Sequence, residues 1–181
     1  MDDQAARQNI LDATDRLFYE HGIRAVGMDA IRDASGVSLR RLYRLFPAKE
    51  DLAEAVLRRR ADAFHAALVA HTANVEPPRE RILAIFDYLH AWFSEPDFRG
   101  CPFINAFGEA HGGSVTRAVS DQKHDFERLL DELVAAAGAP PETGRQLLIL
   151  ANGAMVTAAV LKDPDVALQA KAAAAALLAD A

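Results

Sequence analysis

The chain has 181 residues, a length that suits one or two compact units with a sizeable hydrophobic core. Hydrophobic residues make up 51% of the sequence, which argues against an intrinsically disordered chain. The formal net charge of −6 argues at first against a nucleic-acid partner, but the distribution of charge argues the other way. Residues 36–60 hold 7 basic and 3 acidic side chains, which is the local footprint of a basic surface.

Composition favours an all-α, cytoplasmic protein, because helix-forming residues are abundant and β-branched runs are few. The single cysteine, Cys101, leaves no internal disulfide and suits a reducing compartment. The N-terminus, "MDDQAARQNI", opens with two acids, so we expect no signal peptide. The longest uncharged run, Gln146–Leu161, is shorter than the ~20 apolar residues of a membrane span. We therefore expect a buried helix there and no membrane partner.

Helical periodicity predicts four helices in the first part of the chain, at Asp3–His21, Met28–Ser35, Leu39–Phe46 and Lys49–His71. Gly22 and Gly36 stand where the residue that ends a helix is often left-handed. Ser38 is a suitable N-cap for the third helix, and Pro47 ends it.

The loop Asn74–Glu80 contains two prolines and is the best candidate for a boundary along the chain. Five more helices are predicted after it, at Arg79–Ser94, Phe103–Ala110, Val115–Ala137, Glu142–Leu161 and Asp165–Ala179. The segments between them are rich in turn-forming residues.

The second and third helices, joined by a tight glycine turn and flanked by longer helices, have the arrangement of a helix-turn-helix. Gly36 can take the positive φ of the turn at no steric cost, and Ala34 is small enough to let the two helices approach. The side chains expected to face inward are Met28, Ile31, Ala34, Val37, Leu42 and Phe46.

The outer faces of the third helix should carry Leu39, Arg40, Arg41, Tyr43, Arg44 and Leu45. A recognition helix enters the major groove by its N-terminal residues, and arginine is well suited to a bidentate contact with guanine. Leu39 could contact a thymine methyl group. The alternative is an ordinary solvated basic face, which exposed arginines usually form.

The stretch "GVSLRRLYRLFPAKEDL" resembles the DNA-binding signature of the tetracycline-repressor (TetR) family. The residues that match the signature in register are Gly36, Val37, Ser38, Leu42, Tyr43, Phe46, Lys49, Glu50 and Leu52. The preceding segment, "ILDATDRLFYEHGIRAVGMDAIRDASGVS", agrees as well, so the resemblance covers roughly residues 6–57.

The resemblance implies that Tyr43 hydrogen-bonds a DNA phosphate and that Lys49, at a helix N-terminus, holds another. Such contacts position a protein on DNA without reading its sequence. The expected DNA-binding residues are Gly27, Ser38, Leu39, Arg40, Arg41, Tyr43, Arg44 and Lys49.

Three positions depart from the family pattern. Gly27 stands where a Thr or Ser often caps the second helix, and Ala48 replaces a frequent Ser or Asn cap. Arg40 stands where a small residue is common, so the contacts with the operator should differ from those of relatives. The run Arg58–Arg60 could add phosphate contacts, but a solvated helix face is the favoured interpretation.

The resemblance also implies a C-terminal helical domain that dimerises and often holds a small ligand. The helix Glu142–Leu161 carries small residues that would let another helix approach closely: Ala151, Ala154, Ala158 and Ala159. With the alanine-rich last helix it could form half of a four-helix interface in a homodimer, and packing within one chain is the alternative.

The segment "FRGCPFINAFGEA" resembles a stretch found in one broad group of TetR-like regulators. The residues expected to line a pocket for a largely apolar effector are Phe86, Leu89, Trp92, Phe93, Phe103, Asn105, Phe107, Phe126 and Met155. The aromatic residues among them could equally be core.

Cys101 lies near a helix start that could lower its thiol pKa, but inert packing is the favoured interpretation. The histidines lack metal-ligand spacing, so no metal site and no cofactor are expected. An enzyme that pairs Cys101 with His111 lacks an oxyanion loop and a cofactor fingerprint, so no enzymatic activity is expected.

The sequence as a whole predicts a TetR-like transcriptional regulator, a repressor released from a palindromic double-stranded DNA operator by a small effector. A helix-turn-helix domain is expected at residues 1–48 and an effector-binding and dimerisation domain at 49–181, with residues 49–71 as the connecting helix. The alternative is a DNA-binding regulator that is constitutive or controlled by a protein partner.

Overall fold

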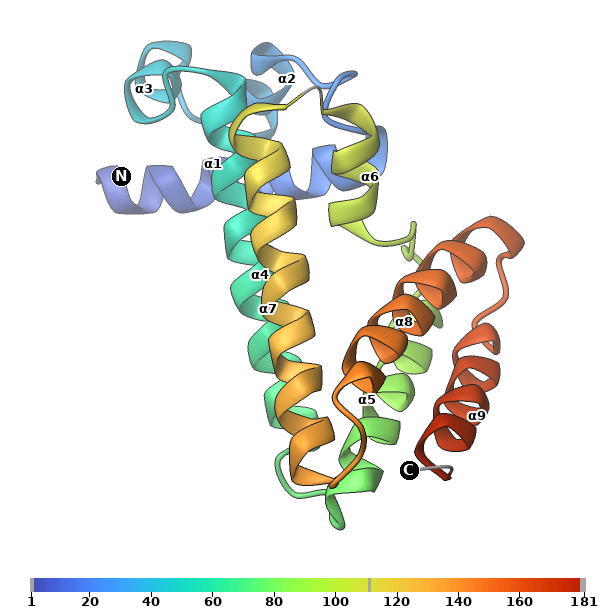
Figure 1. Ribbon diagram of the computed structural model, residues 1–181. Coiled ribbons are helices and arrows are strands. Elements are labelled where there is room, and N and C mark those ends of the chain that lie inside the picture. The colour runs from blue at the N-terminus through green and yellow to red at the C-terminus, as the bar shows by residue number, and fades with distance from the viewer. Residues whose placement is uncertain (1, 111, 180–181) are drawn as a thin grey trace. The chain divides into compact units, whose positions relative to one another are not determined.

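The computed structural model describes residues 2–110 and 112–179, and the regular elements in these two ranges are all helices (Figure 1). They are α1 (Asp3–His21), α2 (Met28–Ser35), α3 (Leu39–Leu45), α4 (Lys49–Thr72), α5 (Pro78–Phe93), α6 (Pro102–Glu109), α7 (Gly113–Ala136), α8 (Glu142–Leu161) and α9 (Val166–Ala179). Three predicted helices have the observed bounds, and the other six differ by one or two residues at one end or at both. The all-α prediction is confirmed.

The chain folds into two compact units. Unit 1 comprises Met1–Ala61 and Pro102–Asp121, and unit 2 comprises Asp62–Cys101 and Gln122–Ala181. Helices α4 and α7 each contribute residues to both units, so the division falls within helices and not in a loop.

In unit 1, α1 begins at the N-cap Asp2, whose carboxylate accepts a hydrogen bond from the Ala5 amide at 2.7 Å. The helix ends at Gly22, where φ is +85°, a conformation that a residue with a Cβ rarely adopts. Its buried face includes Ala6, Ile10 and Phe18. Helix α2 packs on α1, and α3 packs on α2; both are too short to be stable alone.

The turn between α2 and α3 follows the predicted helix-turn-helix pattern. Gly36 adopts the left-handed conformation, with φ of +66°, and its amide donates to the Arg32 carbonyl. Val37, Leu42 and Phe46 are each at most 2% exposed, as predicted for inward-facing residues.

Two details of this motif differ from the expectations. Ala34 is exposed and Ser35 is buried, because Ser35 lies one helical turn after the buried Ile31 and therefore shares its face. Ser38 occupies the N-cap position of α3, but its side chain makes no capping hydrogen bond.

In unit 2, α5, α8 and α9 pack against one another and bury the apolar faces of all three helices. Ala151, Ala154 and Ala158 of α8 are at most 4% exposed, so this unit already covers these small residues. The alanine stripe expected at a dimer interface therefore packs within the chain.

Helix α8 is long and apolar enough to cross a membrane by length and composition alone. It packs on α5 and α9 in unit 2. A core helix of a globular protein has the same length and composition, so these two properties do not indicate a membrane span.

Candidate nucleic-acid interface

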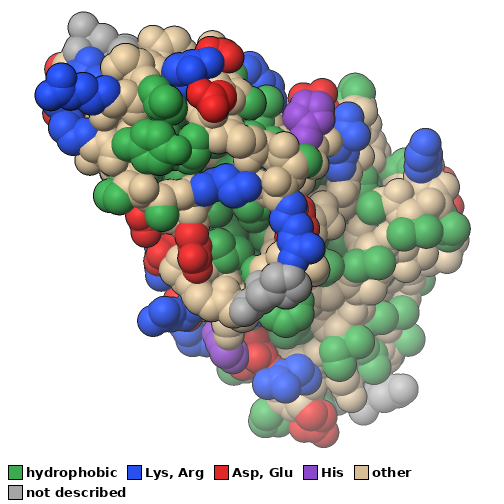
Figure 2. Space-filling model, turned by 90° about the horizontal axis from the view of Figure 1, so that it is seen from above, with side chains coloured by type: hydrophobic (Ala, Val, Ile, Leu, Met, Phe, Trp, Pro, Cys, Tyr) green, Lys and Arg blue, Asp and Glu red, His purple; other side chains and the backbone are tan. Residues whose placement is uncertain are grey.

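Helix α3 presents a basic outer face. Arg40 is exposed, Arg44 has a 61% exposed side chain, and Tyr43 is 46% exposed, whereas Leu42 on the opposite face is fully buried. Figure 2 shows Lys and Arg side chains gathered at the left of the molecule, on the side where Figure 1 places α3. A short helix with one buried residue and several exposed cations can lie against a polyanion.

Two of these arginines share one carboxylate. The Oδ1 atom of Asp3 accepts hydrogen bonds from Nε and Nη2 of Arg41, at 2.9 and 2.6 Å, and from Nη2 of Arg44 at 2.6 Å. The hydrogen bond from Arg41 and the positive charge of Arg44 hold the pKa of the Asp3 carboxyl below its usual value. Asp3 thus occupies a position at which an anion can bind both guanidinium groups.

Asp3 and the three arginines line one open cleft of about 650 Å³, together with Ser38. Three guanidinium groups against a single carboxylate give its lining a formal charge of +2. Phosphate oxygens fit such a cleft, since arginine binds them through charge-assisted, often bidentate hydrogen bonds. Asp3 is not among the residues predicted for the interface, and the acidic start of the chain is the one signal in the sequence that points to it.

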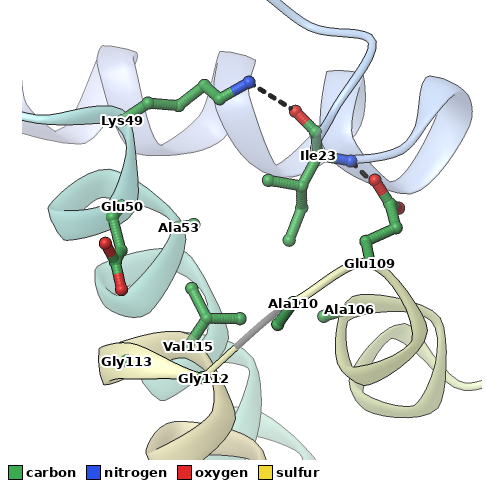
Figure 3. Close-up of a pocket in the computed structure, with 10 residues that line it drawn as sticks. All are labelled: Ile23, Lys49, Glu50, Ala53, Ala106, Glu109, Ala110, Gly112, Gly113 and Val115. Atoms are coloured by element: carbon green, nitrogen blue, oxygen red, sulfur yellow. Dashed lines mark hydrogen bonds between the residues drawn. The ribbon is translucent and has the colours of Figure 1, made fainter.

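Lys49 lies at the start of α4, as predicted, but its ammonium group faces the loop between α1 and α2. Its Nζ donates to the carbonyl oxygens of Ile23 at 2.9 Å, Arg24 at 3.4 Å and Val26 at 3.1 Å. Figure 3 shows the first of these bonds. The phosphate contact expected for Lys49 stays a prediction, and it would have to compete with these carbonyls.

Gly27 and Leu39 take the positions expected of them at helix starts. Gly27 is the exposed N-cap of α2 and an added Cβ would meet no atom within 4 Å, so space does not require a glycine there. Leu39 begins α3 and is half-buried.

The run of three arginines in α4 forms ion pairs within unit 1. Arg58 pairs with Glu54 and Asp121, and Arg59 pairs with Asp12. Arg60 pairs with Asp15, and its guanidinium lies 4.5 Å from the centre of the Tyr19 ring. These contacts agree with the favoured interpretation of a helix face and leave the α3 arginines as the basic surface.

The nine residues expected to line an effector pocket are divided between the units. Phe86, Leu89, Trp92, Phe93, Phe126 and Met155 belong to unit 2, and Phe103, Asn105 and Phe107 belong to unit 1. Phe86, Leu89, Phe93, Phe126 and Met155 are at most 5% exposed, Trp92 is half-buried, and Phe107 is 58% exposed. Phe103 is buried, and Asn105 is exposed beside a small cavity of unit 1.

Phe64 is a further member of the aromatic cluster in unit 2. Its ring centre lies 5.4 Å from that of Phe126, 6.0 Å from Tyr88 and 6.1 Å from Trp92. Burial raises the pKa of the Tyr88 hydroxyl. Phe64 was not among the residues predicted to line the pocket, because no local pattern connects it with Tyr88, Trp92 or Phe126.

Cys101 is buried, and the Lys123 ammonium lies 3.6 Å from its sulfur. His111, considered as a partner for Cys101, lies outside the described residues. In the described part of the chain, no three His, Cys, Asp or Glu side chains are grouped to hold a metal ion.

Comparison with known proteins gives similarities over part and over all of the chain. Residues 10–56 match the family model described as bacterial regulatory proteins, tetR family. The structure is similar to that of a TetR-family transcriptional regulator from Streptomyces coelicolor, with 31% identity, a TM-score of 0.90, and coverage of 98% of this chain and 96% of that chain. A putative TetR transcriptional regulator from Streptomyces avermitilis has 29% identity, a TM-score of 0.87 and 97% coverage of both chains.

An uncharacterized HTH-type transcriptional regulator from Mycobacterium tuberculosis is 35% identical over 80 residues, which is 44% of this chain. The matched segment spans 40% of the length of that relative.

Proposed function

Because the chain belongs to the TetR family of transcriptional regulators, we propose that it is a cytoplasmic repressor that binds a palindromic operator as a homodimer and is released by a small, largely apolar effector. The observation that carries the DNA-binding part of this proposal is the arginine-lined cleft of α3. Arg40 and Arg44 are exposed and Arg41 is partly exposed, on a helix that the helix-turn-helix holds at the surface of unit 1.

The residues of α3 have separate roles in this proposal. Leu39 and Arg40, at the N-terminal end, contact base edges in the major groove. Arg41 and Arg44 exchange the Asp3 carboxylate for DNA, and Tyr43 donates its hydroxyl to a phosphate. Gly27 and Ser38 bring the exposed N-termini of α2 and α3 close to the phosphate backbone, and Lys49 remains a candidate phosphate ligand.

The dimer interface is proposed on the outer face of α8. Ile149, Val156 and Val160 are 63%, 44% and 73% exposed, and with Gly153 they follow the i, i+4, i+7, i+11 spacing of one helical stripe. A second copy of α8 and α9 would cover this stripe and complete a four-helix interface. The dimer would place two recognition helices about one DNA turn apart, ~34–36 Å.

The aromatic cluster of unit 2 supports the effector part of the proposal. Phe64, Tyr88, Trp92 and Phe126 present ring faces and edges that suit an apolar molecule with a polar group. To act as an inducer, the effector must bind one arrangement of the dimer better than the other.

The test is a titration of the purified protein against a fluorescent fragment of its own upstream DNA, at several salt concentrations and with non-specific competitor. Saturable binding that survives competitor is expected. Arg40→Gln should reduce the preference for operator over random DNA by about tenfold, because it removes one base contact per subunit. Arg128→Gln, which removes an exposed arginine from unit 2, is the matched control and should leave the preference unchanged.

Weak binding that competitor abolishes would contradict the repressor proposal. Operator binding that no small molecule relieves would favour constitutive or partner-controlled regulation instead.

A further inference from the structure

Unit 1 contains a cavity beside the helix-turn-helix (Figure 3). Its volume is about 360 Å³, within the range of about 300–1,000 Å³ that is usual for small-molecule sites. The lining residues are Ile23, Lys49, Glu50, Ala53, Ala106, Glu109, Ala110, Gly112, Gly113 and Val115. They come from the α1–α2 loop, the start of α4, the end of α6 and the start of α7.

One part of the lining is apolar and is made of small or branched side chains. Ile23, Ala53, Ala106, Ala110 and Val115 point toward the open space in Figure 3. Such a lining can cover a compact hydrocarbon body and offers it no hydrogen bond.

The charged side chains of the lining favour a cationic ligand, because the ammonium group of Lys49 is already engaged. Among the lining residues that the structure describes, Lys49 is the one cation, and its three N–H groups can all be used by the carbonyls of Ile23, Arg24 and Val26. Glu50 of α4 and Glu109 of α6 lie on opposite sides of the cavity, and the described lining residues have a formal charge of −1.

Both carboxylates keep acceptor capacity. Glu109 accepts from the Ile23 amide through Oε1 at 3.1 Å and from the Arg24 amide through Oε2 at 2.7 Å. Glu50 accepts from the Ser114 amide through Oε1 at 3.1 Å. A carboxylate has about four acceptor positions, so each group can accept a further charged donor.

We propose that this cavity binds a small protonated amine with an apolar body, and that its occupation changes DNA affinity through the α1–α2 loop. The ammonium group of the ligand donates to Glu109, beside the α1–α2 loop, and the hydrocarbon body packs on the alanines and Val115. An anion would meet two carboxylates and an ammonium that is already engaged, so a cation is the class that fits.

The effect on DNA affinity, which rests on the proposed function, follows from the hydrogen bonds that fix the α1–α2 loop. Glu109 binds two of its amides, Lys49 binds three of its carbonyls, and α2 begins directly after it. Gly22 permits the close approach of α6, because a Cβ there would lie 2.8 Å from Oε1 of Glu109. A cation that draws on Glu109 therefore competes with the bonds that set the position of α2.

The site is tested by a ¹⁵N–¹H NMR titration of the whole protein with benzylamine, which is protonated at neutral pH, benzyl alcohol and benzoate. Benzylamine should shift the amide signals of Ile23, Gly113 and Val115 and bind about tenfold more tightly than benzyl alcohol, with benzoate weakest. Glu109→Gln should weaken benzylamine about tenfold. Glu20→Gln, an exposed carboxylate of α1, is the matched control and should have no effect.

Ala110→Leu fills the cavity without changing a charge, and it should abolish the shifts for benzylamine. Equal shifts from benzylamine and benzyl alcohol, shifts confined to other parts of the protein, or binding that survives Ala110→Leu would each overturn the site.

The coupling is tested by repeating the DNA titration with saturating benzylamine, for the wild type and for Ala110→Leu. A severalfold change in DNA affinity is expected for the wild type alone, within the usual range of about 5–150-fold for allosteric coupling. Unchanged DNA affinity despite bound benzylamine would overturn the coupling and leave the proposed function intact. Absence of DNA binding would overturn the proposed function and the coupling together, and the NMR titration would still decide the site.

Discussion

Lys49→Met removes an ammonium group and keeps most of the volume of the side chain, so it measures what the charge does. A hydrogen bond to a charged group contributes about 1.5–3 kcal/mol when water is excluded. Lys49 makes three such bonds, but it is half-buried and water can replace part of each. We therefore expect the free energy of unfolding to fall by about 1–3 kcal/mol in total.

Urea denaturation measures the loss of stability, and the salt dependence of DNA binding shows where the ammonium acts. If Lys49 stays on the α1–α2 loop when DNA is bound, the slope of log K against log salt should be unchanged. If it moves to a phosphate, the slope should become shallower by about 0.9 per subunit in Lys49→Met. Lys162→Met removes an exposed ammonium in unit 2 and is the control for the change in net charge.

Unchanged stability in Lys49→Met would refute the reasoning from the loop contacts. A shallower slope would confirm the phosphate contact that the family resemblance implies.

Four other changes have definite expected outcomes. Tyr43→Phe should weaken operator and random DNA alike, by about 1 kcal/mol in fluorescence anisotropy, and a loss confined to the operator would contradict a phosphate contact. Leu42→Ala empties a fully buried position of α3, so urea denaturation should show a loss of about 2–5 kcal/mol, and a loss under 1 kcal/mol would mean that α3 is not anchored there. The pKa of Glu54 lies below 4.5, chiefly because Arg58 donates a hydrogen bond to it, so the pair stabilises the fold fully above pH 4.5 and loses this effect as the pH falls through the lowered value. Wild type and Glu54→Gln should accordingly differ in stability at neutral pH and converge once the pH has fallen below the lowered pKa of Glu54, and a constant difference would show that the charge is not responsible. Val160→Glu places a charge on the exposed stripe of α8, and light scattering should show a monomer; a dimer of unchanged affinity would locate the interface elsewhere.

The helices were predictable because their ends are marked by residues with strong local preferences. Gly22 and Gly36 have the positive φ values that end α1 and α2, and Pro47 follows α3. The phase of a short helix is less well determined, since α2 has 8 residues and two turns cannot separate Ala34 from Ser35 as the inward residue.

The long-range contacts of the candidate interface and of the cavity in unit 1 could not be predicted from the sequence. Asp3 meets Arg41 across 38 positions, and Glu109 meets Arg24 across 85. Neither pair has a local pattern, because tertiary packing alone brings the partners together. The small residues of α8 were recognised as a close-packing stripe, but composition cannot tell whether the approaching helix belongs to the same chain.

The proposed dimer interface on the apolar stripe of α8 makes the stability of the fold depend on the concentration of the protein. Ile149, Val156 and Val160 are exposed in a single chain, so pairing through the proposed interface would stabilise each copy by mass action. The melting temperature should rise with protein concentration, and a scarce copy should unfold and be degraded more readily than an abundant one. Loss of expression would then remove the regulator from the cell faster than dilution by growth alone.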